Sequence, residues 1–408
     1  MMLEVPRFSL TERDRRWTAV RRMMSEASLD CLVMWGESGK WEAKISSVRY
    51  LTQIGGNGEE GVLIFPKEGE PTMFLWNCIM EPFWRNAQDW IKDIRERARG
   101  QNWVSCIVGQ LKKLGLLRGR IGLVSGSLRE PEILPYKLYT ELVKELSQAQ
   151  ISDATHILET ARLIKSPEEI RFLERAGEIG DAMTEALRAT ARPGVKECEV
   201  YAEVLRVMVA RGGEVPTLLL WGCGPGPGGS GPFAHPGRMP TTRTIQSGDV
   251  IIMEMHPKYG GYVIHQERTV FVGEPLKLYR DLYKAGLAGF KKGVEKLTPE
   301  FSIGEPVKVL REVIRESGFS YREACIHGHG LESGDPPNAG DIPSTPADCF
   351  VPFPMPTQKF SPGMIPGLNI DISTPDWSTS TMLADTYLIT ETGSRKLTHY
   401  NLEPIIVG

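Results

Sequence analysis

The second half of the chain repeats its own order of secondary structure. Each repeat contains a long helical segment, then a break followed by an amphipathic helix, then a glycine turn followed by a strand. The matching pairs are RAGEIG (175–180) with KAGLAG (284–289), 191–213 with 297–319, and 247–255 with 362–371. Two such halves predict a domain with a pseudo-twofold axis, in which the strands of both halves form one curved sheet.

A capped helix introduces this repeat. Ser166 is a natural N-cap residue, Pro167 suits the first helical position, and Glu169 completes the spacing of a capping box. We place a domain boundary just before this helix. The boundary gives an N-terminal domain of residues 1–159 and a C-terminal domain of residues 160–408.

The N-terminal domain alternates strand-like and helix-like segments. Residues 30–36 and 120–126 are candidate strands, residues 60–76 have the pattern of a hairpin, and residues 136–146 have helical spacing. The predicted fold class is therefore α/β (α+β), with a small α/β domain followed by the repeated domain and its curved sheet.

The composition excludes several classes of partner. The net charge is −3, and no basic cluster marks a surface for nucleic acid or for an anionic membrane. No apolar run is long enough for a signal peptide or a membrane span. The seven cysteines are scattered and form no C-x-x-C pair, which favours a reducing compartment. We expect a cytoplasmic enzyme that acts on a small molecule, with no nucleic-acid or membrane partner.

Acidic and imidazole side chains occupy one face of two predicted strands. In GGYVIHQERTVF (260–271), His265 and Glu267 are two residues apart and therefore point to the same side. Glu254 and His256 share a face of the preceding strand in the same way. A strand face of this kind is either solvated or the floor of an active site.

Two further segments carry histidines among glycines. His235 lies in the Gly/Pro-rich segment 222–240, and His327 and His329 lie in HGHGLESGDPP (327–337). We expect both segments to be irregular, and glycines beside imidazoles are typical of a metal-binding or catalytic loop. If the two halves pack symmetrically, these loops border a pocket that contains Glu254, His265, Glu267, Asn369 and Ala384.

Taken together, these motifs resemble those of the creatinase, aminopeptidase P and prolidase superfamily, which shares the pita-bread fold of methionine aminopeptidase. The segments that carry the resemblance are LIKSPEEI, TTRTIQSGDVI, GGYVIHQERTVF, HGHGLESGDPP and SPGM. The resemblance implies hydrolysis of a C–N bond. It also implies a homodimer in which the N-terminal domain of one subunit covers the active site of its neighbour.

The metal-dependent members of this superfamily hold two divalent ions with the ligands Asp, Asp, His, Glu and Glu. The resemblance places these ligands, in order, at Glu254, His265, His327, Asn369 and Ala384. Asn369 is a neutral donor and Ala384 is no ligand, whereas two divalent ions need carboxylates that neutralise about four positive charges. We therefore expect a degenerate site without a dimetal centre, and no cofactor.

The leading hypothesis is a metal-independent hydrolase, or a C–N lyase, that acts on a small polar molecule by acid/base catalysis similar to that of creatinase. His235 is then the proton shuttle, and Glu267 and His327 complete the catalytic set. The proposed substrate-binding residues are Glu254, His265, His329 and Asn369.

Two alternatives stay open. In the first, Glu254, His265 and His327 hold one divalent ion (Zn, Fe or Mn), which His256 or Asp371 could supplement. The chain is then a metal-dependent hydrolase or lyase, and an Xaa-Pro peptidase-like activity belongs to this alternative. In the second, the chain is a non-catalytic binding protein on the same fold.

Overall fold

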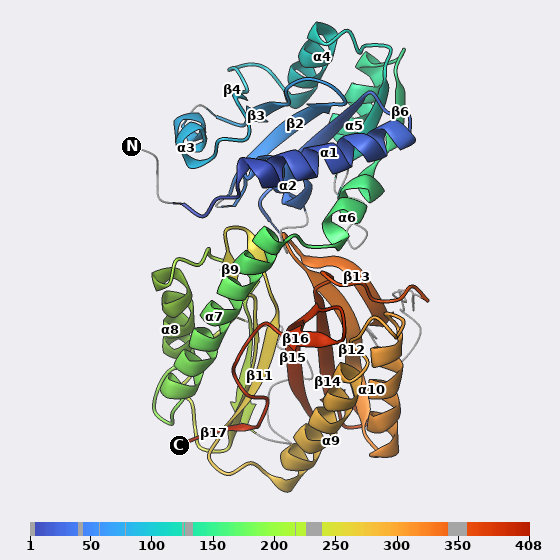
Figure 1. Cartoon of the computed structure of the whole chain (residues 1–408). Helices are drawn as coiled ribbons and strands as arrows, with labels where there is room; N and C mark the ends of the chain where they lie inside the picture. Colours follow the sequence, from blue (N-terminus) through green and yellow to red (C-terminus); the bar gives the residue numbers. More distant parts are fainter. Residues whose placement is uncertain are drawn as a thin grey trace. The chain divides into compact units, whose positions relative to one another are not determined.

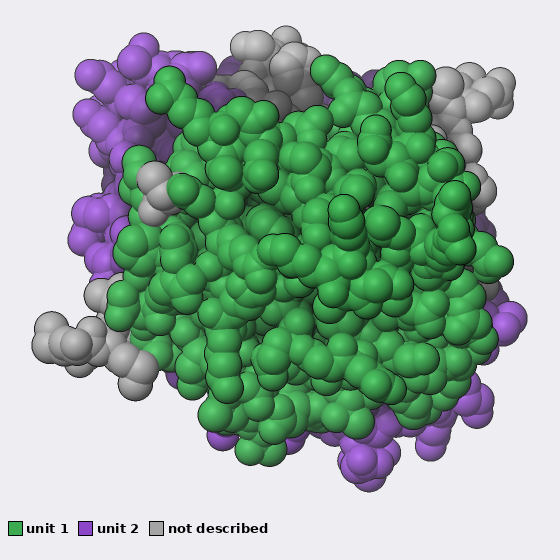
Figure 2. Space-filling model, turned by 90° about the horizontal axis from the view of Figure 1, so that it is seen from above, with its two compact units in different colours: residues 1–163 green, residues 164–408 purple. Residues whose placement is uncertain are grey.

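The computed structural model describes residues 5–39, 44–56, 58–77, 79–124, 126, 134–216, 218–225, 239–341 and 357–408. The chain divides into two compact units, residues 1–163 and 164–408, which Figure 2 colours separately. Within the described residues, no helix is both long and apolar enough to cross a membrane.

The first unit is built on a mixed sheet. Its described residues form a six-stranded sheet with the order β4-β3-β2-β1-β5-β6. The strands are β1 (Cys31–Glu37), β2 (Glu60–Pro66), β3 (Thr72–Leu75), β4 (Asp93–Glu96), β5 (Arg120–Val124) and β6 (Gln150–Asp153). The helices are α1 (Leu10–Glu26), α2 (Ser46–Thr52), α3 (Met80–Ala87), α4 (Trp103–Lys113), α5 (Tyr136–Glu145) and α6 (Thr155–Leu163). The predicted hairpin is confirmed as the antiparallel pair β2–β3.

The second unit contains the repeat. Each half begins with two helices that pack on each other, and strands follow (Figure 1). The helices are α7 (Pro167–Thr190), α8 (Glu197–Ala210), α9 (Lys277–Val294) and α10 (Glu305–Glu316). The strands of the first half are β7 (Leu220–Pro225), β8 (Asp249–Met255), β9 (Lys258–Tyr259), β10 (Tyr262–Val263) and β11 (Gln266–Val272). Those that follow are β12 (Ser320–His329), β13 (Ser333–Asp341), β14 (Pro366–Ser373), β15 (Ser380–Ile389), β16 (Ser394–Lys396) and β17 (Ile405–Val407).

One large sheet joins the two halves. Among the described residues it has nine strands, and its main order is β13-β12-β14-β15-β11-β8-β7. The two halves meet where β11 pairs with β15 in antiparallel orientation. The predicted fold class is thus confirmed, with both halves contributing strands to a single sheet.

The glycines of the repeated RAGEIG and KAGLAG segments let the helices lie close to this sheet. On α7, a Cβ at Gly177 would lie 2.2 Å from the carbonyl oxygen of Leu397. On α9, a Cβ at Gly286 would lie 3.0 Å from the side chain of Ile372 on β14. The repeat therefore reflects a packing requirement, because a larger side chain at either position would crowd the segment on which the helix packs.

The N-terminus of α7 is capped as predicted. The side chain of Ser166 accepts a hydrogen bond from the backbone N–H of Glu169, and the Glu169 carboxylate accepts one from the N–H of Ser166. Glu169 also accepts a hydrogen bond from the hydroxyl of Tyr262 on β10, at 2.8 Å. One side chain thus caps the helix and ties it to the strand that precedes the candidate site.

The prediction that HGHGLESGDPP is irregular is wrong. β12 continues through His329, and β13 begins at Ser333 as its antiparallel partner. Gly328 allows this because a Cβ there would lie 2.2 Å from the carbonyl oxygen of Asp335 on β13. The glycine permits a close approach of two strands, with a register shift beside it, where the sequence pattern indicated a loop.

Candidate metal and catalytic site

Three rows of side chains cross one face of the large sheet. Residues opposite each other on paired strands share a face, and so do residues two apart along a strand. From β8 to β12, the central row contains Glu254, Glu267, Ala384, Asn369 and Cys325. The histidine row contains His256, His265, Thr386, Gly367 and His327. The outer row contains Ile252, Thr269, Met382, Asp371 and Glu323.

A break in the strand positions His265. β10 ends at Val263 and β11 begins at Gln266, so His265 lies between two strands. The hydroxyl of Thr386 accepts a hydrogen bond from the N–H of His265 at 3.0 Å and donates one to its carbonyl at 2.8 Å. A side chain on β15 thus takes the place of a strand partner and fixes the backbone that carries the imidazole.

Glu254 lies between two imidazoles. Its Oε1 atom is 2.8 Å from Nε2 of His256 and 3.5 Å from Nε2 of His265. The rings of His256 and His265 stack with their centroids 4.8 Å apart. Nε2 of His265 is also 3.4 Å from Oε1 of Glu267. The first half of the repeat therefore gathers two carboxylates and two imidazoles, all buried.

The second half adds its own polar cluster. The thiol of Cys325 donates to Oε1 of Glu323 at 3.0 Å. Nδ2 of Asn369 lies 3.3 Å from the same oxygen and 2.7 Å from Nε2 of His327. Glu323 and Cys325 were not predicted from the sequence, although Glu323, Cys325 and His327 follow one another at two-residue intervals, which places them on one face of a strand.

The histidines of the two clusters meet. The ring of His327 stacks on that of His265 with centroids 4.9 Å apart, and His329 lies 4.8 Å from His327. His329 fits only because residue 367 is glycine, since a Cβ there would lie 2.4 Å from its Nε2 atom. The structure thus brings together Glu254, His265, Glu267, His327, His329 and Asn369. His235 lies outside the described residues.

Like charges dominate the electrostatics of the face. Burial, followed by the charges of Glu254, Glu323 and Asp371, raises the pKa of Glu267 well above its ordinary value. Burial and the charge of Glu323 do the same for the pKa of Asp371. No residue of the three rows is lysine or arginine. Four buried carboxylates on one face favour the binding of protons or of a metal cation.

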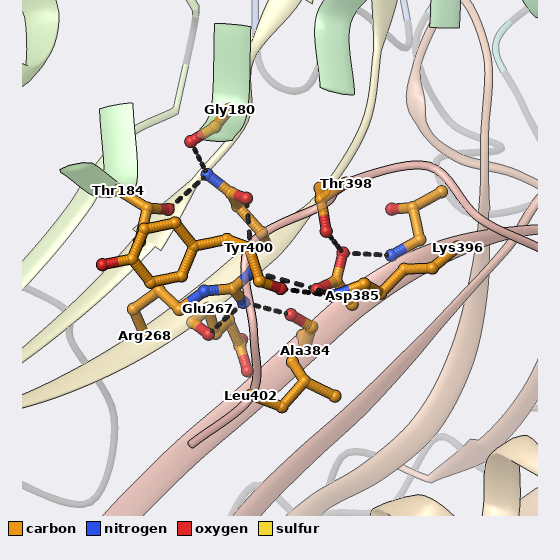
Figure 3. A network of polar contacts seen from close by, with 12 residues as sticks. Gly180, Thr184, Glu267, Arg268, Ala384, Asp385, Lys396, Thr398, Tyr400 and Leu402 are labelled. Carbon is orange, nitrogen blue, oxygen red and sulfur yellow. Dashed lines mark hydrogen bonds and ion pairs between the residues drawn. The ribbon is translucent and has the colours of Figure 1, made fainter. Parts of the chain in front are cut away.

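A network on the opposite face of β11 holds the two halves in register (Figure 3). Arg268 donates to the carbonyl oxygens of Glu267 and Ala384 at 2.8 and 2.9 Å, and to Oδ2 of Asp385 at 2.9 Å. Asp385 also accepts a hydrogen bond from the hydroxyl of Thr398 at 2.8 Å. The Arg268–Asp385 pair therefore fixes β11 against β15, and this pairing places Glu267 opposite Ala384.

Comparison with known proteins assigns the family. Residues 171–391 match the profile of metallopeptidase family M24, and residues 16–164 match the creatinase/prolidase N-terminal domain. The chain belongs to metallopeptidase family M24. The resemblance to creatinases, aminopeptidases P and prolidases is thereby confirmed.

Several M24 relatives have named activities. The Xaa-Pro dipeptidase of Pyrococcus horikoshii is 28% identical over 277 residues, which cover 67% of this chain and 73% of that protein. The ectoine hydrolase of Halomonas elongata is 25% identical over 278 residues, 65% of each chain. The solved Xaa-Pro dipeptidase from Bacillus anthracis has a TM-score of 0.75 at 22% identity and covers 97% of this chain and 100% of its own. These relatives confirm the prediction of an enzyme of the C–N hydrolase class. The homodimer and the cytoplasmic location stay predictions.

The expectation of no cofactor is wrong, because the family to which this M24 chain belongs is a family of metallopeptidases. Asn369 and Ala384 occupy two of the family ligand positions, but the sheet places other carboxylates nearby. Glu267 lies directly opposite Ala384, and Glu323 contacts Asn369.

The donor set of this M24 face fits a divalent ion. Three groups of buried side chains each offer ligand atoms that lie within 4.8 Å of one another. The groups are Glu254, His256 and His265; His265, His327 and His329; and Glu323, Cys325 and His327. Carboxylate, imidazole and thiolate are the donors that Zn²⁺, Fe²⁺ and Mn²⁺ accept in proteins, thiolate suiting Zn²⁺ best.

Proposed function

We propose that this chain is a metal-dependent hydrolase that cleaves the C–N bond of a small amide, with an Xaa-Pro dipeptide as the leading substrate class. The family assignment and the dipeptidases among the relatives support the reaction class. The observation that carries metal dependence is the position of Glu254 Oε1 between the Nε2 atoms of His256 and His265. Two imidazoles and one carboxylate are a sufficient ligand set for one divalent ion.

We assign the first metal position to Glu254, His256 and His265. A divalent ion in such a site polarises a carbonyl group and favours attack by water. His329 lies beside this position, with its ring centroid 5.8 Å from that of His265, where it can orient the substrate by hydrogen bonds.

Proton transfer in this proposal belongs to Glu267. Its side chain is 1% exposed, and its Oε2 atom accepts no hydrogen bond from the described residues. This oxygen can therefore accept a proton from the attacking water and pass it to the leaving nitrogen, the exchange that amide hydrolysis requires. His235, which the sequence analysis expects to be the proton shuttle, stays a prediction.

The test is metal removal and reloading, followed by an assay against Xaa-Pro dipeptides, ectoine and simple amides. We expect the metal-free enzyme to lose activity and to regain it with Zn²⁺, Mn²⁺ or Fe²⁺. Because loss of residues behind metal ligands costs about 10–100-fold, the ligand variants E254Q and H265A should lose at least about 100-fold in kcat/KM.

The matched control is H399A, since His399 is an exposed histidine on a different segment of the same unit. This variant should keep wild-type activity. Full activity in protein shown by elemental analysis to hold no metal would refute the proposed metal dependence. Hydrolysis of ectoine without hydrolysis of any dipeptide would instead change the assigned substrate class.

A further inference from the structure

We propose that β12 provides a second metal-binding position, formed by Glu323, Cys325 and His327, and that its ion is Zn²⁺. The inference rests on the proposed metal dependence of the pocket and extends it to ligands outside the family positions, since only His327 stands at one of them. A thiolate ligand distinguishes this position from the first.

The strand itself gives the three ligands a common direction. Glu323, Cys325 and His327 occupy alternate positions of β12 and therefore share a face. Their ligand atoms lie within 4.8 Å of one another, and the Cys325 sulfur is 3.0 Å from a Glu323 oxygen. This spacing is close to what a tetrahedral ion needs, because Zn–S and Zn–N bonds of about 2.3 and 2.1 Å separate ligands by roughly 3.5–4 Å.

Asp371 is a candidate fourth ligand beside Glu323, Cys325 and His327. It is the direct cross-strand neighbour of Glu323 on β14, and its carboxyl group is buried on the same face. Two carboxylates in such a position repel each other unless a proton or a cation lies between them. A divalent ion on Glu323, Cys325 and His327 would remove this repulsion.

The charge of the whole face supports a second ion. Glu254, Glu267, Glu323 and Asp371 are all buried, and the three rows contain no lysine or arginine. The first position uses only Glu254 of these four carboxyl groups, and Glu323 and Asp371 form an acidic cross-strand pair in the outer row.

The donor chemistry selects the ion. Thiolate and imidazole together favour Zn²⁺, whereas Mn²⁺ and Mg²⁺ prefer sites built mostly from oxygen. The second position thus supplies donors beside the family positions held by Asn369 and Ala384, since β12 lies next to the strand of Asn369 and two strands from that of Ala384.

Cobalt reports on the thiolate directly, because a thiolate bound to Co²⁺ produces a charge-transfer band in the near ultraviolet that carboxylate and imidazole do not. Metal-free protein should be titrated with Co²⁺ while absorbance is recorded, and bound metal should be counted after gel filtration. We expect two ions per chain and a thiolate band for the wild type. C325S should lose the band and bind one ion, and E323Q should bind the second ion at least about 10-fold more weakly.

Two controls separate this inference from the proposed function. C198S removes a partly exposed thiol on α8 and should leave both the band and the two ions unchanged. E254Q should lose one ion and keep the band, because its defect lies in the first position.

The outcomes are distinct. One ion per chain without a thiolate band would overturn the second position and leave the proposed function intact. No bound ion at all would overturn both. A thiolate band that persists in C325S, shown by circular dichroism to be folded, would also refute the assignment. If C325S does not fold, the affinity of E323Q for the second Co²⁺ ion is the test, and a wild-type affinity would refute the assignment.

Discussion

Replacing Asp385 with asparagine should destabilise the C-terminal unit strongly. Asp385 is fully buried, and its Oδ2 atom lies 2.9 Å from Nη2 of Arg268 and 3.5 Å from Nζ of Lys396. Its Oδ1 atom accepts a hydrogen bond from Thr398. Asparagine removes the negative charge and turns one acceptor into a donor, so that the buried guanidinium loses its counter-ion.

The expected cost follows from this burial. Removing one partner of a buried ion pair costs about 3–5 kcal/mol, and asparagine keeps one acceptor, which favours the lower end of about 3 kcal/mol. In a unit of this size, each kcal/mol lowers the melting temperature by about 2–4 °C. The variant should therefore unfold roughly 6–12 °C below the wild type.

Calorimetry at fixed metal concentration is the appropriate assay, because a bound ion raises the melting temperature by mass action. D281N on α9 is the matched control, since Asp281 forms an exposed pair with Lys277 and should matter little. The double variant R268M/D385L should recover part of the loss, because it leaves no buried charge without a partner. A D385N protein that melts within about 1 °C of the wild type would refute the reasoning, as would a double variant no more stable than D385N.

Two further predictions concern other parts of the chain. G367A places a Cβ 2.4 Å from Nε2 of His329, so hydrolase activity should fall, while G393A, at a position with open space, stays active in the same assay. In the N-terminal unit, burial opposes ionisation of Glu12, but Arg15 and Arg16 outweigh it and hold its pKa below the ordinary value of 4.5. The stability from Glu12 is present above that value and lost as the pH falls through the lowered one, so urea unfolding should show E12Q less stable than the wild type at pH 7, with the gap closing in acid; a gap independent of pH would contradict this.

Sequence reasoning succeeded where the structure depends on local rules. The cap of α7 involves residues three apart, and the common face of His265 and Glu267 follows from strand alternation. Glu254 joins them because β8 and β11 are close in the sequence and pair in antiparallel orientation. These features could be predicted without knowing which distant strands pair.

The site residues that were not predicted depend on the register of strands that lie far apart in the sequence. Cys325 and Glu323 enter the site through the pairing of β12 with β14, which begins about forty residues later in the chain. The glycines around His327 indicated a loop, and this interpretation hid the alternation that carries the two residues into the pocket. The expectation of no metal was wrong for the same reason. Neighbouring strands supply carboxylates to one face, so the negative charge of the site cannot be judged from the family ligand positions alone.

The pairing of β11 with β15 has a consequence for how the two ion positions relate to each other. Each proposed ligand set is local in sequence: Glu254, His256 and His265 belong to one half of the repeat, and Glu323, Cys325 and His327 belong to the other. The distance between the two ions is then a property of the seam between the halves and of neither set alone. A substitution along this seam would alter the spacing of the two proposed positions, while each half kept its own affinity for metal.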